Sequence, residues 1–164
     1  MRILALLMVT ASASQATDIA AGWTHSVAVH DGRVWTWGDN AFGQLGQPDA
    51  RRTLRPRPVA GIDQVVAVAA AWHSLALTAD GQLFAWGRNT YGQLGNGNVG
   101  IEQIERHPNR VTGIEDLVAI SAGWDHSLAL SRKGVVYACG SRAHGQLGDG
   151  TRITGKPRAT FTQV

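Results

Sequence analysis

Apolar and polar residues alternate over short stretches of this chain, as they do in strands that bury one face. In the middle of the chain the alternation predicts strands over residues 65–70, 73–78 and 82–86. Asp80 and Gly81 separate the last two stretches and favour a tight hairpin turn. The apolar spacing of three and four that a helical repeat requires is absent. The pattern therefore predicts an all-β protein.

A proline begins a further segment after each hairpin. These segments are Pro58–Val59, Pro108–Val111 and Pro157–Ala159. Proline has no backbone N–H, so within a sheet it is tolerated mainly at an edge. We therefore expect each segment to form the outer, fourth strand of a sheet.

Two short phrases recur in register and divide the chain into three copies of one unit. Gly-Gln-Leu-Gly occurs at residues 43–46, 92–95 and 145–148, and His-Ser occurs at residues 25–26, 73–74 and 126–127. The copies of the first phrase start 49 and then 53 residues apart. A period near fifty residues with strands inside it indicates the blades of a β-propeller. We expect the repeat region to span residues 17–164, with blades near residues 18–60, 61–111 and 112–164.

Side chains of contrasting size mark the faces by which such blades would stack. In the first copy Trp35 and Trp37 share one face of the returning strand, and Val27 and Val29 share one face of the strand before it. The opposite faces carry small serine and alanine residues. We expect the large side chains of one blade to pack on the small ones of the next, and we assign these residues to the core.

The pairing of the two phrases carries a family resemblance. The first copy reads Ala-Ala-Gly-Trp-Thr-His-Ser-Val-Ala-Val over residues 20–29 and Trp-Thr-Trp-Gly-Asp-Asn-Ala-Phe-Gly-Gln-Leu-Gly over residues 35–46. Over residues 18–160 all three copies resemble the repeat of the regulator of chromosome condensation family. The resemblance implies an all-β fold, a β-propeller of four-stranded antiparallel blades. The family fold closes with seven blades, and the repeats present here supply three.

Three blades do not complete such a ring. An open stack leaves one apolar blade face uncovered at each end. We therefore expect either a fragment of a longer propeller or a chain that associates with itself or with other propeller chains, and we favour the fragment.

The first sixteen residues lie outside the repeats. A positive start at Arg2, an apolar run over residues 3–9 and small residues over 11–16 have the layout of a secretory signal peptide. This layout predicts a secreted or periplasmic protein without a membrane anchor. The alternative is a start codon misplaced within a longer gene, which would leave the protein cytoplasmic.

Charge and cysteine content narrow the function classes. The formal net charge is only +3 with histidine neutral, so we expect no nucleic-acid partner. The single cysteine excludes a disulfide within the chain. Cys139 occupies the place that Trp37 and Trp86 hold in the other copies, and we expect a small, buried, apolar role for it.

Catalytic chemistry is not indicated. Asp125, His126 and Ser127 are the residue types of a catalytic triad, but neighbours along a strand point to opposite faces and cannot form a relay. His-Ser also recurs in every copy, which favours a scaffold role. Equivalent histidines on packed sheets lie about 10 Å apart, too far to share a metal ion. We therefore predict a protein that is not an enzyme and needs no cofactor or metal.

Tryptophans outside the core pattern are the candidate binding residues. Trp23 and Trp124 lie two residues before the repeated histidine and Trp72 lies one residue before it, in loops that open on one rim of a propeller. Exposed tryptophan is enriched in binding hot spots. We predict a protein-binding surface formed by Trp23, Thr24, Trp72, Trp124 and Asp125, unless the rings fold inward over their loops.

Family precedents suggest further functions. The chain is similar to a secreted bacterial β-lactamase inhibitor propeller, in which aromatic residues before the second strand bind the target. The resemblance also implies guanine-nucleotide exchange on a small GTPase as an alternative. A third possibility is a purely structural segment of a larger propeller.

Overall fold

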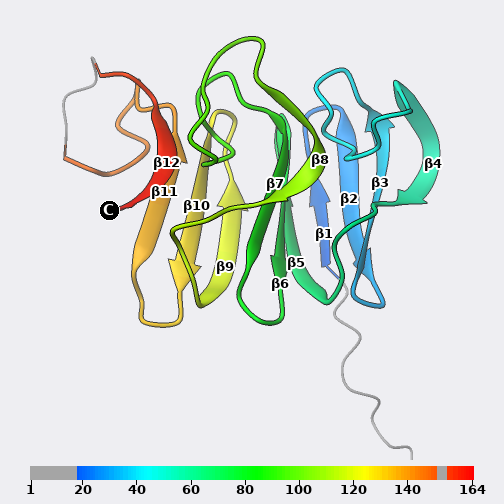
Figure 1. Ribbon diagram of the computed structural model, residues 1–164, viewed down its shortest axis with the longest axis horizontal. Helices are drawn as coiled ribbons and strands as arrows, with labels where there is room; N and C mark the ends of the chain where they lie inside the picture. The colour runs from blue at the N-terminus through cyan, green and yellow to red at the C-terminus, as the bar shows by residue number, and fades with distance from the viewer. Residues whose placement is uncertain (1–17, 151–154) are drawn as a thin grey trace, which may run out of the picture.

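The computed structural model describes residues 18–150 and 155–164. In this part of the chain twelve strands form three four-stranded antiparallel sheets. The sheets stand side by side, with the second in the middle (Figure 1). The prediction of three propeller blades is confirmed. The proposed signal peptide, residues 1–16, lies outside the described residues. Within the described residues no helix is long and apolar enough to span a membrane.

Each blade is a meander whose strands follow one another in chain order. Blade 1 contains β1 (Asp18–Ala21), β2 (His25–His30), β3 (Arg33–Asp39) and β4 (Arg52–Pro58). Blade 2 contains β5 (Val65–Ala70), β6 (His73–Thr78), β7 (Leu83–Arg88) and β8 (Ile104–Arg110). Blade 3 contains β9 (Leu117–Ala122), β10 (His126–Ser131), β11 (Val136–Gly140) and β12 (Arg158–Gln163). The first strands also contact each other between neighbouring blades, because β5 contacts both β1 and β9.

The outer strands differ from the prediction. β4 ends at Pro58 instead of starting there, and β8 begins at Ile104, ahead of Pro108. Only β12 follows its proline, Pro157. Because an outer strand pairs on one side only, proline is tolerated within it, so the position of the proline does not mark where the strand begins.

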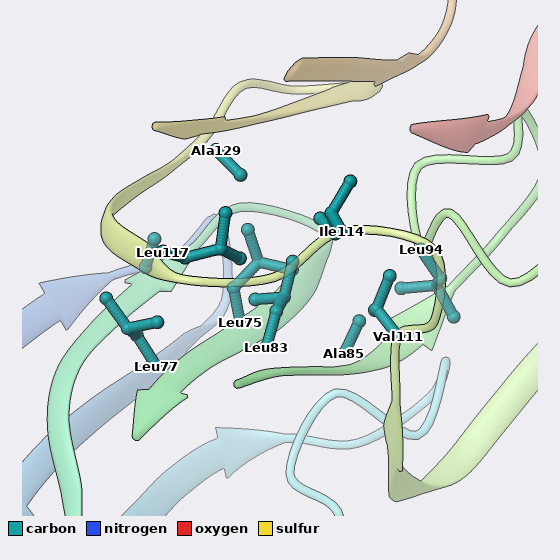
Figure 2. Packing of buried hydrophobic residues seen from close by; sticks show 10 residues of the cluster. Leu75, Leu77, Leu83, Ala85, Leu94, Val111, Ile114, Leu117 and Ala129 are labelled. Atoms are coloured by element: carbon teal, nitrogen blue, oxygen red, sulfur yellow. The ribbon is translucent and has the colours of Figure 1, made fainter. Parts of the chain in front are cut away.

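Blades 2 and 3 enclose a hydrophobic cluster (Figure 2). Leu75, Leu77 and Leu83 of blade 2 are at most 2% exposed. They pack against Ala129 of blade 3 and against Val111, Ile114 and Leu117, which belong to the connecting segment and the start of β9. A second cluster fills the space between blades 1 and 2, with Val27, Val29 and Val34 against Trp86. The core therefore lies between the sheets.

Each blade face mixes large and small side chains, which corrects the predicted separation. Residues paired across neighbouring strands share a face, and Ser74 of β6 pairs with Trp86 of β7. Trp86 thus faces blade 1 beside a small residue, while Leu75 and Leu77 face blade 3. The alternation along each strand was predicted correctly. Which side chains of two neighbouring strands lie on the same face of the sheet depends on the register between the strands.

Polar contacts join blade 1 to blade 2. The hydroxyl of Ser74 donates to the backbone carbonyl of Gln44, 2.8 Å away, and the indole nitrogen of Trp86 donates to the same oxygen at 2.9 Å. Nε2 of His25 lies 2.7 Å from the Ser74 hydroxyl oxygen. Because the Ser74 hydrogen is already donated, neutral His25 carries its hydrogen on Nε2. We call this set of contacts the interblade latch.

The same latch joins blade 2 to blade 3. Nε2 of His73 lies 2.7 Å from the Ser127 hydroxyl, which donates to the carbonyl of Gln93 at 2.6 Å. The thiol of Cys139 takes the place of the indole and lies 3.4 Å from that carbonyl oxygen. Cys139 is fully buried, as predicted.

Candidate protein-binding rim

Three tryptophans from three blades meet at one rim of the stack. Trp23, Trp72 and Trp124 lie in the loops that join the first and second strands of their blades. The ring centroid of Trp23 is 5.4 Å from that of Trp72 and 5.3 Å from that of Trp124, with interplanar angles of 20° and 25°. These values describe stacked rings. The structure therefore gathers the three predicted tryptophans into one cluster, with Trp23 in the middle.

The rings differ in exposure. Trp23 is 63% exposed and Trp124 is 59% exposed. Trp72 is half-buried, and its indole nitrogen is buried without a hydrogen-bond partner. Trp23 and Trp124 thus do not fold into the core. Because Trp23 stacks on both neighbours, the cluster presents less apolar surface than three separate rings would.

Trp72 occupies a different backbone position from the other two. Its carbonyl accepts from the amide of Arg88, as the carbonyls of Thr24 and Asp125 accept from the residues after Gly38 and Gly140. Trp72 is therefore the counterpart of Thr24 and Asp125, and the loop of blade 2 is one residue shorter. The shift by one residue explains why Trp72 is the most buried of the three rings.

Thr24 and Asp125 flank the cluster. Thr24 is exposed, and its hydroxyl oxygen lies 3.4 Å from the amide nitrogen of the Gln44 side chain. Asp125 is half-buried and lies beside His126. Burial lowers the pKa of His126, and the negative charge of Asp125 opposes this shift. Neither residue forms part of the aromatic stack.

Sequence reasoning missed an aromatic and cationic extension of the cluster. The Phe42 ring meets Trp72 edge to face, with centroids 5.6 Å apart. The guanidinium carbon of Arg88 lies 5.5 Å from the ring centres of Phe42 and Trp72 and 5.9 Å from that of Tyr91. Phe42 and Tyr91 both immediately precede a Gly-Gln-Leu-Gly phrase, which is the signal that could have identified them. We call the six residues of the cluster and its extension the tryptophan rim: Trp23, Trp72, Trp124, Phe42, Arg88 and Tyr91.

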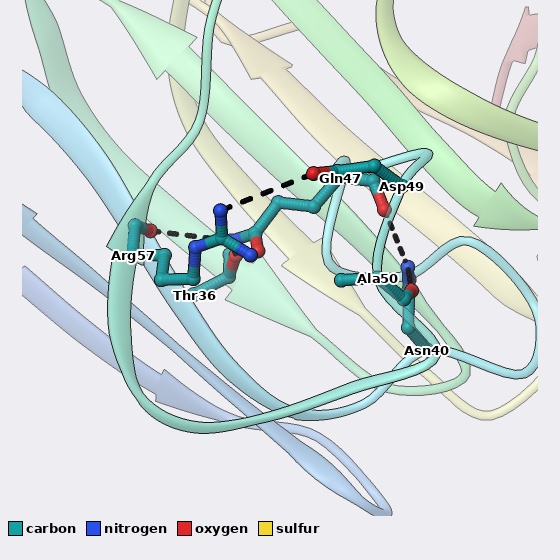
Figure 3. A network of polar contacts seen from close by, with 6 residues as sticks. All are labelled: Thr36, Asn40, Gln47, Asp49, Ala50 and Arg57. Atoms are coloured by element: carbon teal, nitrogen blue, oxygen red, sulfur yellow. Dashed lines mark hydrogen bonds and ion pairs between the residues drawn. The ribbon is translucent and has the colours of Figure 1, made fainter.

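The Gly-Gln-Leu-Gly loop of blade 1 holds Phe42 in place through buried polar contacts. The side chain of Asn40 accepts from the amide of Leu45. Asn40 also donates to the carbonyls of Gln47 and Ala50, and Gln47 donates to Thr36 at 2.8 Å (Figure 3). The amide of Phe42 donates to the side chain of Gln44 at 2.8 Å. These contacts fix the chain direction around Phe42.

Gly43 lets this loop touch the next blade. Its φ is 74°, and a Cβ there would lie 2.8 Å from the carbonyl oxygen of Glu105 on β8. Both the conformation and the contact require glycine. The loop of one blade therefore rests directly on the outer strand of the next.

A shallow hollow of about 290 Å³ opens at the rim. It is lined by Ala21, Gly22, Trp23, Ala71, Trp72 and Trp124. Pockets for small-molecule ligands usually have about 300–1,000 Å³. The hollow is at the lower limit of this range, and its size suits one inserted side chain better than a cofactor.

Two of the three repeated histidines have structural partners in the described blades. His25 and His73 each contact a serine of the following blade, as described above. Burial lowers the pKa of His25 to about 4 and that of His73 to about 3. Within residues 18–150 and 155–164 no three histidine, cysteine, aspartate or glutamate side chains lie close enough to hold a metal ion.

Known proteins contain the same repeat. The model of the regulator of chromosome condensation (RCC1) repeat matches residues 31–77 and 80–130, and a second model of the same repeat matches residues 16–44, 65–93 and 117–146. The ultraviolet-B receptor UVR8 of Arabidopsis thaliana is 37% identical over 136 residues. The probable E3 ubiquitin-protein ligase HERC4 of Homo sapiens is 49% identical over 138 residues, and the secretion-regulating guanine nucleotide exchange factor of Mus musculus is 37% identical over 140 residues.

The matches cover most of this chain but a minor part of each relative. They cover 81%, 82% and 79% of this chain, and 31%, 13% and 30% of UVR8, HERC4 and the exchange factor.

Solved structures agree with the fold. Yeast RCC1 (Prp20), solved bound to Kap60, superposes with a TM-score of 0.78 at 27% identity, over 89% of this chain and 36% of that chain. Human WBSCR16 superposes with a TM-score of 0.79 at 30% identity, over 93% of this chain and 41% of that chain. With the repeat models matching more than half of its residues, the chain belongs to the regulator of chromosome condensation (RCC1) repeat family.

Proposed function

We propose that this chain is a non-enzymatic protein-binding module whose partner docks on the tryptophan rim. The observation that carries the proposal is the stack of Trp23 between Trp72 and Trp124, with two rings about 60% exposed beside a hollow. An exposed tryptophan buries about 150–250 Å² when it is covered. Such a cluster supplies the central contacts of a protein interface.

The partner is expected to insert one apolar side chain into the hollow. Alanine, glycine and tryptophan residues line the hollow, and the exposed rings of Trp23 and Trp124 can contact such a side chain. Arg88 already contacts three aromatic rings, so it holds the rim together and is not the primary contact for an acidic partner.

Alanine variants test the proposal. Trp124→Ala removes an exposed ring, and Val99→Ala is the control, because Val99 is 46% exposed and lies outside the rim. Proteins retained by the immobilised wild type are identified, and the dissociation constant of each purified candidate is measured by calorimetry. Binding at least tenfold weaker to Trp124→Ala, with Val99→Ala unchanged, supports the rim. Equal affinity of the partner for the wild type, Trp124→Ala and Val99→Ala contradicts the proposal.

A small GTPase is one partner class to include. A mouse relative is named as a guanine nucleotide exchange factor, and its match covers 30% of that protein. Release of a fluorescent guanine nucleotide from a purified GTPase measures exchange directly. Faster release with the wild type than with Trp124→Ala would favour this alternative.

Ultraviolet reception is a second candidate function. A relative is named as an ultraviolet-B receptor, and the rim of this chain holds three stacked indoles, the protein side chains that absorb most strongly in that region. A change in oligomeric mass or circular dichroism on ultraviolet-B irradiation, abolished by Trp23→Phe, would support it. An unchanged spectrum and mass would exclude it.

The location of the protein is also a proposal. The layout of residues 1–16 supports export, and the intact mass of the natural protein from culture medium and from cells tests it. A species lacking about the first sixteen residues outside the cell would support a secreted binder. A heavier species inside the cell would instead favour a structural segment of a larger propeller.

A further inference from the structure

The interblade latch is directional, and each blade contributes a different half to each neighbour. Toward the following blade it presents a histidine and the carbonyl of the Gly-Gln-Leu-Gly glutamine. Toward the preceding blade it presents a serine and, beside it, a tryptophan or cysteine. Both halves meet at the two interfaces between the described blades.

The outer face of blade 3 carries the first half. Among the described residues, the imidazole of His126 and the carbonyl of Gln146 form no hydrogen bond, although their counterparts in blades 1 and 2 do. Val136 is 40% exposed, whereas Val34 and Leu83, at the same place, are at most 1% exposed. This face, which we call the forward face, has the groups to hold one more blade.

The glycine of the last Gly-Gln-Leu-Gly loop gives independent support. A Cβ at Gly92 would lie 2.8 Å from the Cα of Ala159 on β12. Gly43 in blade 1 lies equally close to β8 of blade 2. A Cβ at Gly145 would meet no atom within 4 Å. The loop of blade 3 therefore has the shape that receives an outer strand.

The outer face of blade 1, which we call the back face, carries the second half. Ser26 pairs with Trp37 across β2 and β3, as Ser74 pairs with Trp86 in blade 2. The Ser26 hydroxyl and the Trp37 indole form no hydrogen bond with the described residues. They are the groups that would receive a histidine and a glutamine carbonyl.

Exposed apolar side chains on the back face support the same conclusion. Ile19 is 80% exposed, whereas Val68, which holds the same register position in blade 2, is 7% exposed and packs on blade 1. Leu54 on β4 is 88% exposed. By register it corresponds to Ala159, which rests against Gly92.

We propose that the forward face of one copy of this chain docks on the back face of a second copy, head to tail, and completes a third latch between them. His126 would donate to Ser26, and Ser26 and Trp37 would donate to the carbonyl of Gln146. Two copies supply six blades, one fewer than the seven of the family fold and within the range of about four to eight that closed propellers have. The contact is heterologous, because different surfaces of the two copies meet.

The solution mass of the 164-residue chain, measured by light scattering over a concentration series, tests the docking. The wild type is expected to reach at least twice the 17.5 kDa mass of one chain. Ile19→Arg blocks the back face and Val136→Arg blocks the forward face, so each variant alone is expected to stay at the mass of one chain. Ile101→Arg is the matched control, because Ile101 is also 80% exposed but lies in a loop of blade 2.

Mixing the two variants distinguishes head-to-tail docking from other contacts and from misfolding. The intact forward face of Ile19→Arg can bind the intact back face of Val136→Arg, so an equimolar mixture is expected to form pairs. A wild type that stays at 17.5 kDa throughout overturns the proposal. So does a mass that only one of the two variants lowers, or a mixture that forms no pairs.

Discussion

Nε2 of His73 lies 2.7 Å from the hydroxyl oxygen of Ser127, on the neighbouring blade. This contact explains why histidine and serine recur as adjacent residues. Neighbours along a strand point to opposite faces. In blade 2, His73 therefore faces the following blade and Ser74 faces the preceding one, so one dipeptide serves two interfaces.

Removing one latch serine should destabilise the fold. In Ser127→Ala the Nε2–H of His73 loses its acceptor in a fully buried position, and the expected loss in the free energy of unfolding is about 1–3 kcal/mol. Urea denaturation followed by circular dichroism measures it. Ser26→Ala is the matched control, because Ser26 is the counterpart of Ser127 on the back face. In dilute solution this control should lose at most about 0.5 kcal/mol, and equal losses in the two variants would refute the role of the latch.

Acid should weaken the protein through the buried histidines. Burial lowers the pKa of His25 from 6.5 to about 4 and that of His73 to about 3. Between pH 6.5 and 4 the unfolded chain therefore binds more protons than the folded one, and the free energy of unfolding falls as the pH falls. At pH 5 each histidine is expected to lower it by about 2 kcal/mol.

The His73→Gln variant isolates one of these two contributions. It should be less stable than the wild type at pH 7 but should lose less stability between pH 7 and pH 5. Urea titrations at both pH values give the comparison. An equal loss in variant and wild type would show that His73 does not titrate on unfolding.

The rim makes a spectroscopic prediction. Trp23 takes part in both stacked pairs and Trp124 in one. Trp23→Phe should therefore remove the coupled indole signal in circular dichroism, whereas Trp124→Phe should leave part of it. Because both side chains are about 60% exposed, neither variant should change the free energy of unfolding by more than about 1 kcal/mol. Equal spectra of the two variants would contradict the stacking order.

Cys139 should report on unfolding. Burial raises the pKa of its thiol, and its side chain is fully enclosed. The thiolate is the reactive form, so a thiol reagent should label the folded chain only as fast as the chain opens. Labelling should accelerate in urea in parallel with unfolding. Rapid labelling of the native protein would show that the interface between blades 2 and 3 is accessible.

Sequence reasoning predicted the blades because their strands are marked by alternation and by two phrases in register. The bounds of β5 and β6 follow the alternation from Val65 to Ala70 and from His73 to Thr78. The mixed faces were not predicted, since the pairing of Ser74 with Trp86 depends on register between strands.

The rim was predicted only in part. The three tryptophans could be identified because they lie next to the repeated histidine. The order in which the rings stack could not be predicted. It depends on the loop before His73, which is one residue shorter than the corresponding loops of blades 1 and 3. Phe42 and Arg88 were missed because they approach Trp72 from a loop and a strand whose distance from it is set by the packing of blades 1 and 2.

The directional latch also bears on how such a chain can arise. One blade contains both the groups that reach forward and the groups that receive them from behind. Duplication of a single gene segment of about fifty codons therefore yields two blades that already fit each other. Loops can then diverge, as the shorter loop at Trp72 shows, without a new interface having to evolve.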